Sequence, residues 1–159
     1  MKNVLKSGFG LLEIIIGVAI TATFIFTAME VSRFSLRLSE ATIRKAKTAF
    51  LLEEGIEAVK FLRDSGWDAN IGSLTGGTNY YLNFDGSKWQ ATTTNIFIDE
   101  VFERKFILND VNRNADDDIS DFGNPDPDTK KISVSVSSQG RTGTSTEQIS
   151  AYITNLFNN

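Results

Sequence analysis

The side chains best suited to chemistry gather in one acidic stretch of the chain, between positions 110 and 121. Its oxygen-bearing members follow an alternating pattern: Asp110, Asn112, Asn114, Asp116, Asp118 and Asp121. Carboxylate and amide oxygens at this spacing reproduce much of a helix–loop–helix calcium loop, in which hard ligands converge on one ion. Ala115 replaces the turn glycine of such a loop, and Asp121 is shorter than its final glutamate. Two interpretations stay open, a loose calcium-binding loop and a solvated acidic loop.

A second group of carboxylates, Asp99, Glu100 and Glu103, offers candidates for an acid and a base. Nothing in the sequence sets two of them across a cleft, so we expect solvated charges at strand ends. The chain has no His and no Cys, which excludes the commonest general base, thiolate nucleophiles, disulfides and thiolate metal sites. We therefore expect no enzyme activity and no required cofactor. A secreted carbohydrate-active enzyme that uses Asp99 or Glu103 is an alternative that ranks behind the two functions given at the end of the sequence analysis.

Four aromatic residues are candidates for a platform that binds sugars or surfaces: Trp67, Tyr80, Tyr81 and Trp89. Aromatic side chains at strand spacing more often pack in a core or between a helix and a sheet. We expect packing to be their role.

The composition limits the chain to one small domain with an appendage. The 159 residues are 41% hydrophobic and 23% charged, which is typical of globular proteins and not of disordered or polytopic membrane proteins. Charge is unevenly distributed, because removing Lys2 and Lys6 takes the net charge from −4 to −6 and the acidic excess lies after residue 64. An acidic head disfavours direct binding of nucleic acid, which needs a positive surface.

An apolar segment follows a short basic one at the N-terminus. Lys2 and Lys6 are the charges of residues 1–8, and Glu13 is the only charge from Phe9 to Met29. As a helix this segment is about 31 Å long, enough to cross the hydrocarbon core of a bilayer. The positive-inside rule places the N-terminus in the cytoplasm and the chain after Met29 outside. We expect a single-pass protein of the cytoplasmic membrane.

Helical patterning continues beyond the apolar segment. No proline interrupts residues 9–64, and Ser65 and Gly66 supply a helix stop, so the sequence predicts one helix of roughly 80 Å. Residues 30–64 are predicted to be amphipathic, with an apolar stripe opposite a charged face. The stripe comprises Phe34, Leu38, Ala41, Ala49, Leu52, Ile56 and Val59, and the charged face comprises Arg33, Arg37, Arg44, Lys47 and Glu54.

The rest of the chain, residues 65–159, is predicted to be a β-rich globular head. Strands are expected at 79–84, 87–92, 102–108 and 130–138. A tight turn at Asp85 and Gly86 joins the first two as a hairpin. The segment 147–157 is either a strand that pairs with 130–138 or a helix. The predicted fold class is α+β: a long N-terminal helix whose outer half packs on a C-terminal antiparallel sheet.

The N-terminal residues resemble those of type IV prepilins, the precursors of pilins and pseudopilins. Gly8 ends the basic leader, Phe9 is the first residue after it, and Glu13 is the fifth. Gly10 stands where these proteins usually have threonine, and the proline kink of many pilin helices is missing. The resemblance covers roughly the first third of the chain.

This resemblance implies a maturation pathway and a set of partners. A prepilin peptidase cuts between Gly8 and Phe9, the new amine of Phe9 is methylated, and residues 9–29 anchor and polymerise the subunit. The implied partners are membrane lipid before assembly, an inner-membrane assembly platform, and other pilin subunits in a helical filament. The implied function is structural: a subunit, expected to be minor, of a type IV pilus or of a secretion or DNA-uptake pseudopilus, extracellular or periplasmic. The alternative from another class is a signal-anchored surface receptor or adhesin that does not polymerise.

The position of Glu13 supports the resemblance on physical grounds. A bare carboxylate within hydrocarbon costs a few kcal/mol, so it usually has a partner or a role. The amine of Phe9, freed about one turn away or offered by a neighbouring subunit, is the expected partner. Such a pair sets the stagger between subunits. The other interpretation is that Glu13 is an interfacial acid at the level of the lipid headgroups.

Overall fold

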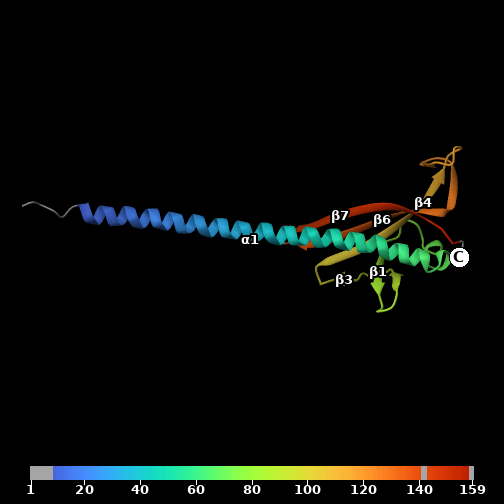
Figure 1. The fold of residues 1–159 in the computed structure, drawn as a ribbon, viewed down its shortest axis with the longest axis horizontal. Helices are drawn as coiled ribbons and strands as arrows, with labels where there is room; N and C mark the ends of the chain where they lie inside the picture. Colours follow the sequence, from blue (N-terminus) through green and yellow to red (C-terminus); the bar gives the residue numbers. More distant parts are fainter. Residues whose placement is uncertain (1–8, 141–142, 158–159) are drawn as a thin grey trace, which may run out of the picture. The chain divides into compact units, whose positions relative to one another are not determined.

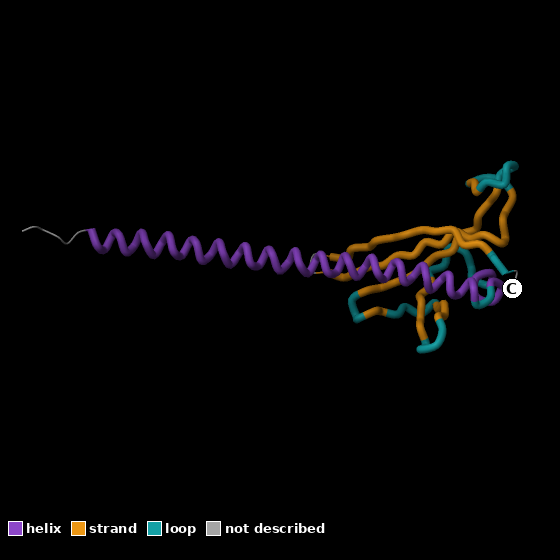
Figure 2. The backbone as a smooth tube through the Cα atoms, in the orientation of Figure 1, coloured by secondary structure: helices purple, strands orange, loops and turns teal. Residues whose placement is uncertain are grey.

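A computed structural model describes residues 9–140 and 143–157 of the chain. It divides into two compact units, Met1–Ile43 and Arg44–Asn159. One unbroken helix, α1 (Phe9–Asp64), supplies residues to both units (Figures 1 and 2). Its bounds confirm the predicted helix of residues 9–64, whereas the predicted leader, residues 1–8, lies outside the described residues.

The helix ends where the sequence predicts a stop. The backbone N–H of Ser65 donates to the carbonyl of Phe61 at 2.9 Å, and that of Gly66 donates to the carbonyl of Arg63 at 3.2 Å. Gly66 has a φ of 139°, a conformation that favours glycine. A short π-helical turn that the sequence did not predict, η1 (Asp68–Gly72), follows at once. It carries Ile71 into the core beside the buried Trp67.

The head contains one antiparallel sheet, so the α+β fold class is confirmed. Its strands are β1 (Tyr80–Phe84), β2 (Trp89–Thr92), β3 (Phe97–Ile98), β4 (Phe102–Arg113), β5 (Ile119–Ser120), β6 (Asn124–Gly140) and β7 (Gly143–Thr154). The order across the sheet is β2-β1-β4-β6-β7, and β3 and β5 both pair with β4. The strand alternative for residues 147–157 is therefore the one adopted as far as Thr154.

Alternation along β4 and β6 produces the buried face of the sheet. Phe106 on β4 lies opposite Val134 on β6, and both are fully buried. Ser133, Ser135 and Ser137 take the other face, as the alternation within residues 130–138 predicts, whereas Ser138 is buried. The core that forms between this face and α1 contains Ile56, Ala58, Val59, Leu62, Trp67, Ile71, Tyr80, Leu82, Phe106, Leu108, Ile132, Val134 and Ile153.

The outer half of α1 meets the sheet through part of the predicted stripe, Leu52, Ile56 and Val59, and also through residues that the prediction placed on the charged face. The expected charged face includes Arg44, Lys47 and Glu54, but these side chains contact the head. Arg44 donates to the Gln139 carbonyl at 2.7 Å, Lys47 pairs with Asp99, and Glu54 pairs with Arg104 at 2.9 Å. Ala49, expected in the stripe, is exposed. The prediction was wrong for these positions because long charged side chains at the margin of a buried stripe extend to polar partners on the sheet.

The β1–β2 hairpin is confirmed, but its turn is centred one residue later than predicted. Phe84 lies opposite Trp89, and the Asp85 N–H donates to the Lys88 carbonyl at 3.1 Å. The positive φ of 95° belongs to Gly86. The Asp85 carboxylate accepts the backbone N–H groups of Ser87 and Lys88, both at 2.9 Å, which closes the turn. The same bonds, that from Lys88 first, lower the pKa of Asp85.

Gly55 lets the helix approach the sheet closely. A Cβ at this position would lie 2.7 Å from Cγ1 of Val134 and 3.2 Å from Cδ of Arg104. Glycine inside a helix costs about 1 kcal/mol of stability relative to alanine. At position 55 the close packing of the helix on the sheet offsets this cost.

We expect Gly55→Ala to destabilise the head by about 1 kcal/mol, because overpacking in the middle of its usual range costs about 2 kcal/mol and the gain in helix propensity offsets about 1 kcal/mol of it. Denaturant unfolding of the full chain in detergent micelles measures this. Gly76→Ala is the matched control, since its Cβ would lie at an ordinary 3.6 Å from the Leu108 carbonyl oxygen. A Gly55→Ala variant as stable as wild type would contradict the packing account.

Candidate functional site

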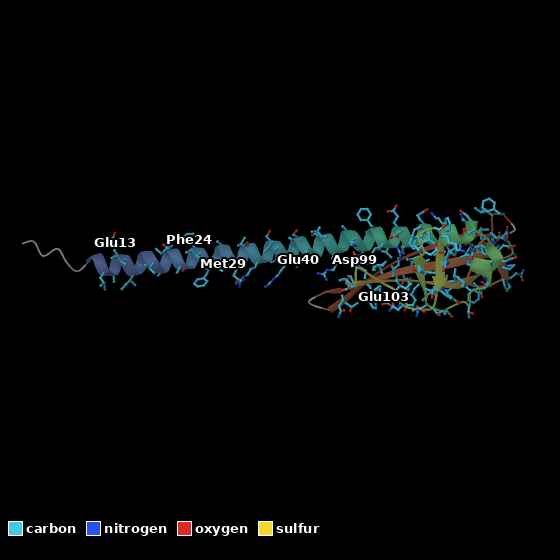
Figure 3. The ribbon with its side chains drawn as sticks, turned by 90° about the horizontal axis from the view of Figure 1, so that it is seen from below. Glu13, Phe24, Met29, Glu40, Asp99 and Glu103 are labelled. Carbon is cyan, nitrogen blue, oxygen red and sulfur yellow. The ribbon has the colours of Figure 1, made fainter. Side chains whose placement is uncertain are left out.

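The first part of α1, from Leu11 to Met29, presents an exposed apolar surface. Between Leu11 and Met29 its large hydrophobic side chains remain 47–75% exposed. They are Leu11, Leu12, Ile14, Ile15, Ile16, Val18, Ile20, Phe24, Ile25, Phe26 and Met29. Figure 3 shows Phe24 and Met29 on this stretch of helix. By length and composition the helix is able to cross a membrane.

Three threonines in this segment donate hydrogen bonds from their hydroxyl groups to backbone carbonyls of the same helix. Thr21 donates to the Gly17 carbonyl at 2.8 Å, and Thr23 donates to the Ala19 carbonyl at 2.9 Å. Thr27 donates to the carbonyl of Thr23 at 2.8 Å. Such i to i−4 bonds satisfy the hydroxyl groups without water. The threonines are therefore compatible with hydrocarbon or with tight packing against another helix.

Glu13 is the charged residue of this apolar surface. Its side chain is exposed on the second turn of α1, and it makes no hydrogen bond or ion pair with another residue of the described part of the chain (Figure 3). Phe9 begins the helix four residues earlier, which is about 6 Å along the axis. Gly8 and the leader lysines lie outside the described residues, so cleavage and methylation at Gly8 and Phe9 stay predictions.

The acidic stretch 110–121 is a strand, a turn and a second strand. Asp110 and Asn112 lie on β4, and the Asp110 carboxylate pairs with Lys130 at 2.6 Å. The Asn114 side-chain oxygen accepts the backbone N–H groups of Asp116 at 3.0 Å and Asp118 at 2.9 Å, and Asp121 follows β5. Within the described residues no three Asp or Glu side chains gather as a metal site. Calcium binding stays a prediction, and it requires these side chains to rearrange.

We call residues 110–128 the acidic arm, the part of the head where β4 and β6 bend away from the sheet (Figures 1 and 2). Arg113 joins its two sides, because its Nε lies 2.6 Å from Oδ2 of Asp126. Its Nη1 also donates to the Asp117 carbonyl at 2.7 Å. The hydrogen bond from Arg113 lowers the pKa of Asp126 and raises that of Arg113.

This ion pair makes the stability of the arm depend on pH. Because the pKa of Asp126 is lowered by folding, its contribution is complete above the ordinary carboxyl pKa of about 4 and disappears as the pH falls through the folded-state value. We expect Asp126→Asn to lower the unfolding temperature at about pH 6, and the difference from wild type to shrink towards about pH 2. Circular dichroism measures both. The control is Asp116→Asn, at an exposed site; an Asp126→Asn effect independent of pH would argue against the pair.

The carboxylates near β3 have separate partners. Asp99 and Glu100 form a turn with φ values of 48° and 59°, and Asp99 pairs with Lys47 of α1. Glu103 accepts the Tyr81 hydroxyl at 3.1 Å and the Asn95 amide at 3.0 Å. Burial, and then the bond to Glu103, raise the pKa of Tyr81. Asp99 and Glu103 therefore act in the structure as contacts between elements.

The four candidate aromatic residues do not form one platform. Trp67 and Tyr80 are in the core, where the Tyr80 and Phe106 ring centres are 5.7 Å apart, so the packing interpretation is confirmed for them. Tyr81 lies on the other face of β1. Trp89 is half-buried and packs on the Phe84 ring with centres 5.2 Å apart.

Arg104 has a structural role that the sequence analysis did not predict. It is a buried arginine on the inward face of β4, with its guanidinium carbon 5.1 Å from the Trp89 ring centre and its Nη1 2.9 Å from the Glu54 carboxylate. Its Nε has no hydrogen-bond partner among the described residues. The signal was its place between Phe102 and Phe106, at an inward position of the alternating pattern.

Comparison with known proteins assigns no family. No family model matches the chain, and no curated protein or solved structure matches it either. The architecture is pilin-like. It consists of a long, N-terminal apolar helix followed by an antiparallel sheet, and the apolar helix indicates membrane anchoring or a signal sequence.

Proposed function

We propose that this chain is a structural subunit of a type IV pilus or pseudopilus. Glu13 carries the proposal, because it is a carboxylate set in an exposed helix that is otherwise uncharged from Phe9 to Met29. An ordinary membrane anchor has no need of this residue. A polymerising helix has a use for it, since a buried ion pair between subunits specifies their stagger.

Burial of the apolar surface drives insertion into the membrane in this proposal, and van der Waals packing between helices then favours assembly. Moving one large aliphatic or aromatic side chain out of water contributes about 1.5–3 kcal/mol. The side chains between Leu11 and Met29 therefore outweigh the cost of about 3 kcal/mol for a carboxylate within a membrane. Lipid covers this surface before assembly, and the helices of neighbouring subunits cover it afterwards. Pairing of Glu13 with the amine of Phe9 then recovers part of the electrostatic cost.

The proposal includes the maturation steps and the location. A prepilin peptidase removes residues 1–8, the amine of Phe9 is methylated, and an inner-membrane platform adds the subunit to a filament. The precursor is a single-pass protein with its head outside the cytoplasm, and the filament is extracellular or periplasmic. The structural role requires no catalysis, no cofactor and no contact with nucleic acid.

Gly8→Ala tests the maturation step. The variant should stay at precursor mass in the membrane fraction and be absent from sheared filaments, because the residue before the cut is no longer glycine. Immunoblotting of both fractions measures this. A signal-anchored receptor or adhesin predicts no change in size or location, so an unaltered Gly8→Ala protein would favour that alternative.

Glu13→Val tests the assembly step. We expect normal cleavage and at least about a tenfold loss of subunit from filaments, since a missing pair worth about 1.4 kcal/mol gives that factor per contact. Glu40→Val is the matched control, an exposed glutamate outside residues 9–29 of the same helix (Figure 3). Wild-type filament content in the Glu13→Val strain would contradict the register role.

A further inference from the structure

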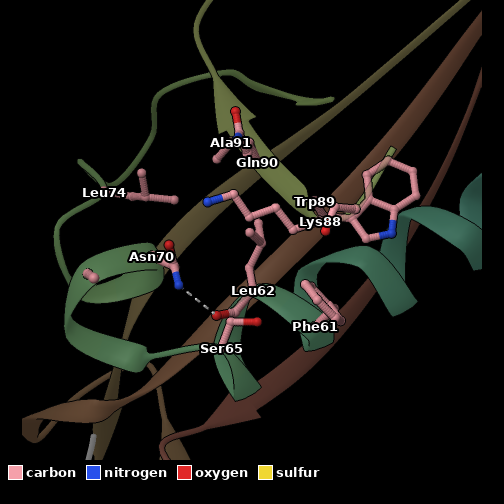
Figure 4. A pocket seen from close by; sticks show the side chains of 11 residues that line it. Phe61, Leu62, Ser65, Asn70, Leu74, Lys88, Trp89, Gln90 and Ala91 are labelled. Atoms are coloured by element: carbon pink, nitrogen blue, oxygen red, sulfur yellow. Dashed lines mark hydrogen bonds between the residues drawn. The ribbon is translucent and has the colours of Figure 1, made fainter. Parts of the chain in front are cut away.

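The head contains a pocket between the end of α1, η1 and β2 (Figure 4). It lies entirely within the unit Arg44–Asn159. Its volume is about 710 Å³, which falls within the range of small-molecule sites. The lining residues come from three short segments: Phe61, Leu62 and Ser65; Ala69, Asn70 and Leu74; and Ser87, Lys88, Trp89, Gln90 and Ala91.

The lining combines apolar surface with neutral hydrogen-bonding groups. Leu62 is buried, and Leu74 and Ala91 are half-buried. Asn70 donates its amide to the Leu62 carbonyl at 3.3 Å, and this bond holds the side chain in place (Figure 4). Gln90 lies between Trp89 and Ala91 on β2, so its side chain is on the other face of the strand, where its amide donates to Asp85 at 2.9 Å. The Asn70 amide oxygen is then available to accept a bond from a ligand hydroxyl.

Lys88 gives this pocket its charge. No Asp or Glu is among the lining residues, although the head as a whole has an acidic excess. The Lys88 side chain extends over the pocket, and its ammonium makes no hydrogen bond or ion pair with another described residue (Figure 4). The neighbouring Asp85 carboxylate attracts this ammonium without a direct bond, since it accepts backbone N–H groups of its own turn. The pocket therefore presents an unpaired cation that favours an anionic ligand.

Trp89 and Phe61 supply aromatic surface to the same pocket. The Trp89 ring is held by the buried Arg104, 5.1 Å from its centre, and by the Phe84 ring. Phe61 lies on the last turn of α1 and is 42% exposed, so part of its ring is accessible to a ligand. A ligand with a flat apolar side and a polar edge would cover both residues.

We propose that this pocket binds an acidic saccharide, a sugar ring that bears a carboxylate. The C–H side of the ring packs on Trp89 and Phe61, the carboxylate pairs with Lys88, and a ring hydroxyl bonds to Asn70. Of the four aromatic residues that the sequence offers for sugar binding, Trp89 alone lines this pocket. The proposal is independent of filament assembly, because all its groups belong to the unit Arg44–Asn159.

Three probes separate the contributions of ring and charge: D-glucuronate, D-glucose and acetate. Saturation-transfer NMR and tryptophan fluorescence on the full chain in detergent micelles measure their binding. We expect glucuronate to bind with a millimolar dissociation constant, glucose to bind at least about tenfold more weakly, and acetate to show no saturation transfer. Equal binding of the two sugars, acetate binding as strong as glucuronate, or no binding of glucuronate would each overturn the proposal.

Variants then locate the binding site. Lys88→Gln should reduce glucuronate binding to the level of glucose, and Phe61→Ala should weaken both sugars. Lys105→Gln is the charge-matched control on the other face of the sheet, and it should bind like wild type. Circular dichroism establishes that each variant is folded. Glucuronate binding unchanged by Lys88→Gln, or equally reduced by Lys105→Gln, would place the sugar elsewhere and contradict the site.

Discussion

The constraint on which the account depends is the unpaired carboxylate of Glu13 within an apolar helical surface. Water solvates the carboxylate but leaves the surrounding apolar side chains exposed to water. Lipid solvates those side chains but leaves the carboxylate without a partner in hydrocarbon. An environment of other helices, one of which offers a positive group, satisfies both requirements. The back-bonded threonines fit this environment, because their hydroxyl groups need neither water nor a partner helix.

The outer half of the helix faces a different requirement, since it must hold the head. Gly55 allows close approach to β4 and β6, and Arg104 occupies the adjoining space with its charge paired to Glu54. Lys47 and Arg44 add contacts at the margin of the same face. The head is thereby joined to the helix by packing and by polar bonds together, as a subunit requires if its helix is to carry the head into an assembly.

Local patterns in the sequence predicted the main elements, but they missed β3, β5, η1 and several side-chain partners that are distant in the sequence. The helix bounds followed from the absence of proline and from Ser65 and Gly66, and the alternation of residues 130–138 identified the centre of β6. The polar ends of β4 and β6 were missed because their ladders pair residues that do not alternate in polarity. The helix face was misassigned for Arg44 and Lys47 because their partners lie on segments distant in the sequence.

Intact mass and N-terminal sequencing of the protein from the filament or membrane fraction of its native cell test the central claim most directly. The account predicts a chain that starts at Phe9 and carries one methyl group on its amine. A stable membrane protein that retains residues before Phe9 would contradict it, because Glu13 would then lack the positive partner on which the proposed assembly depends.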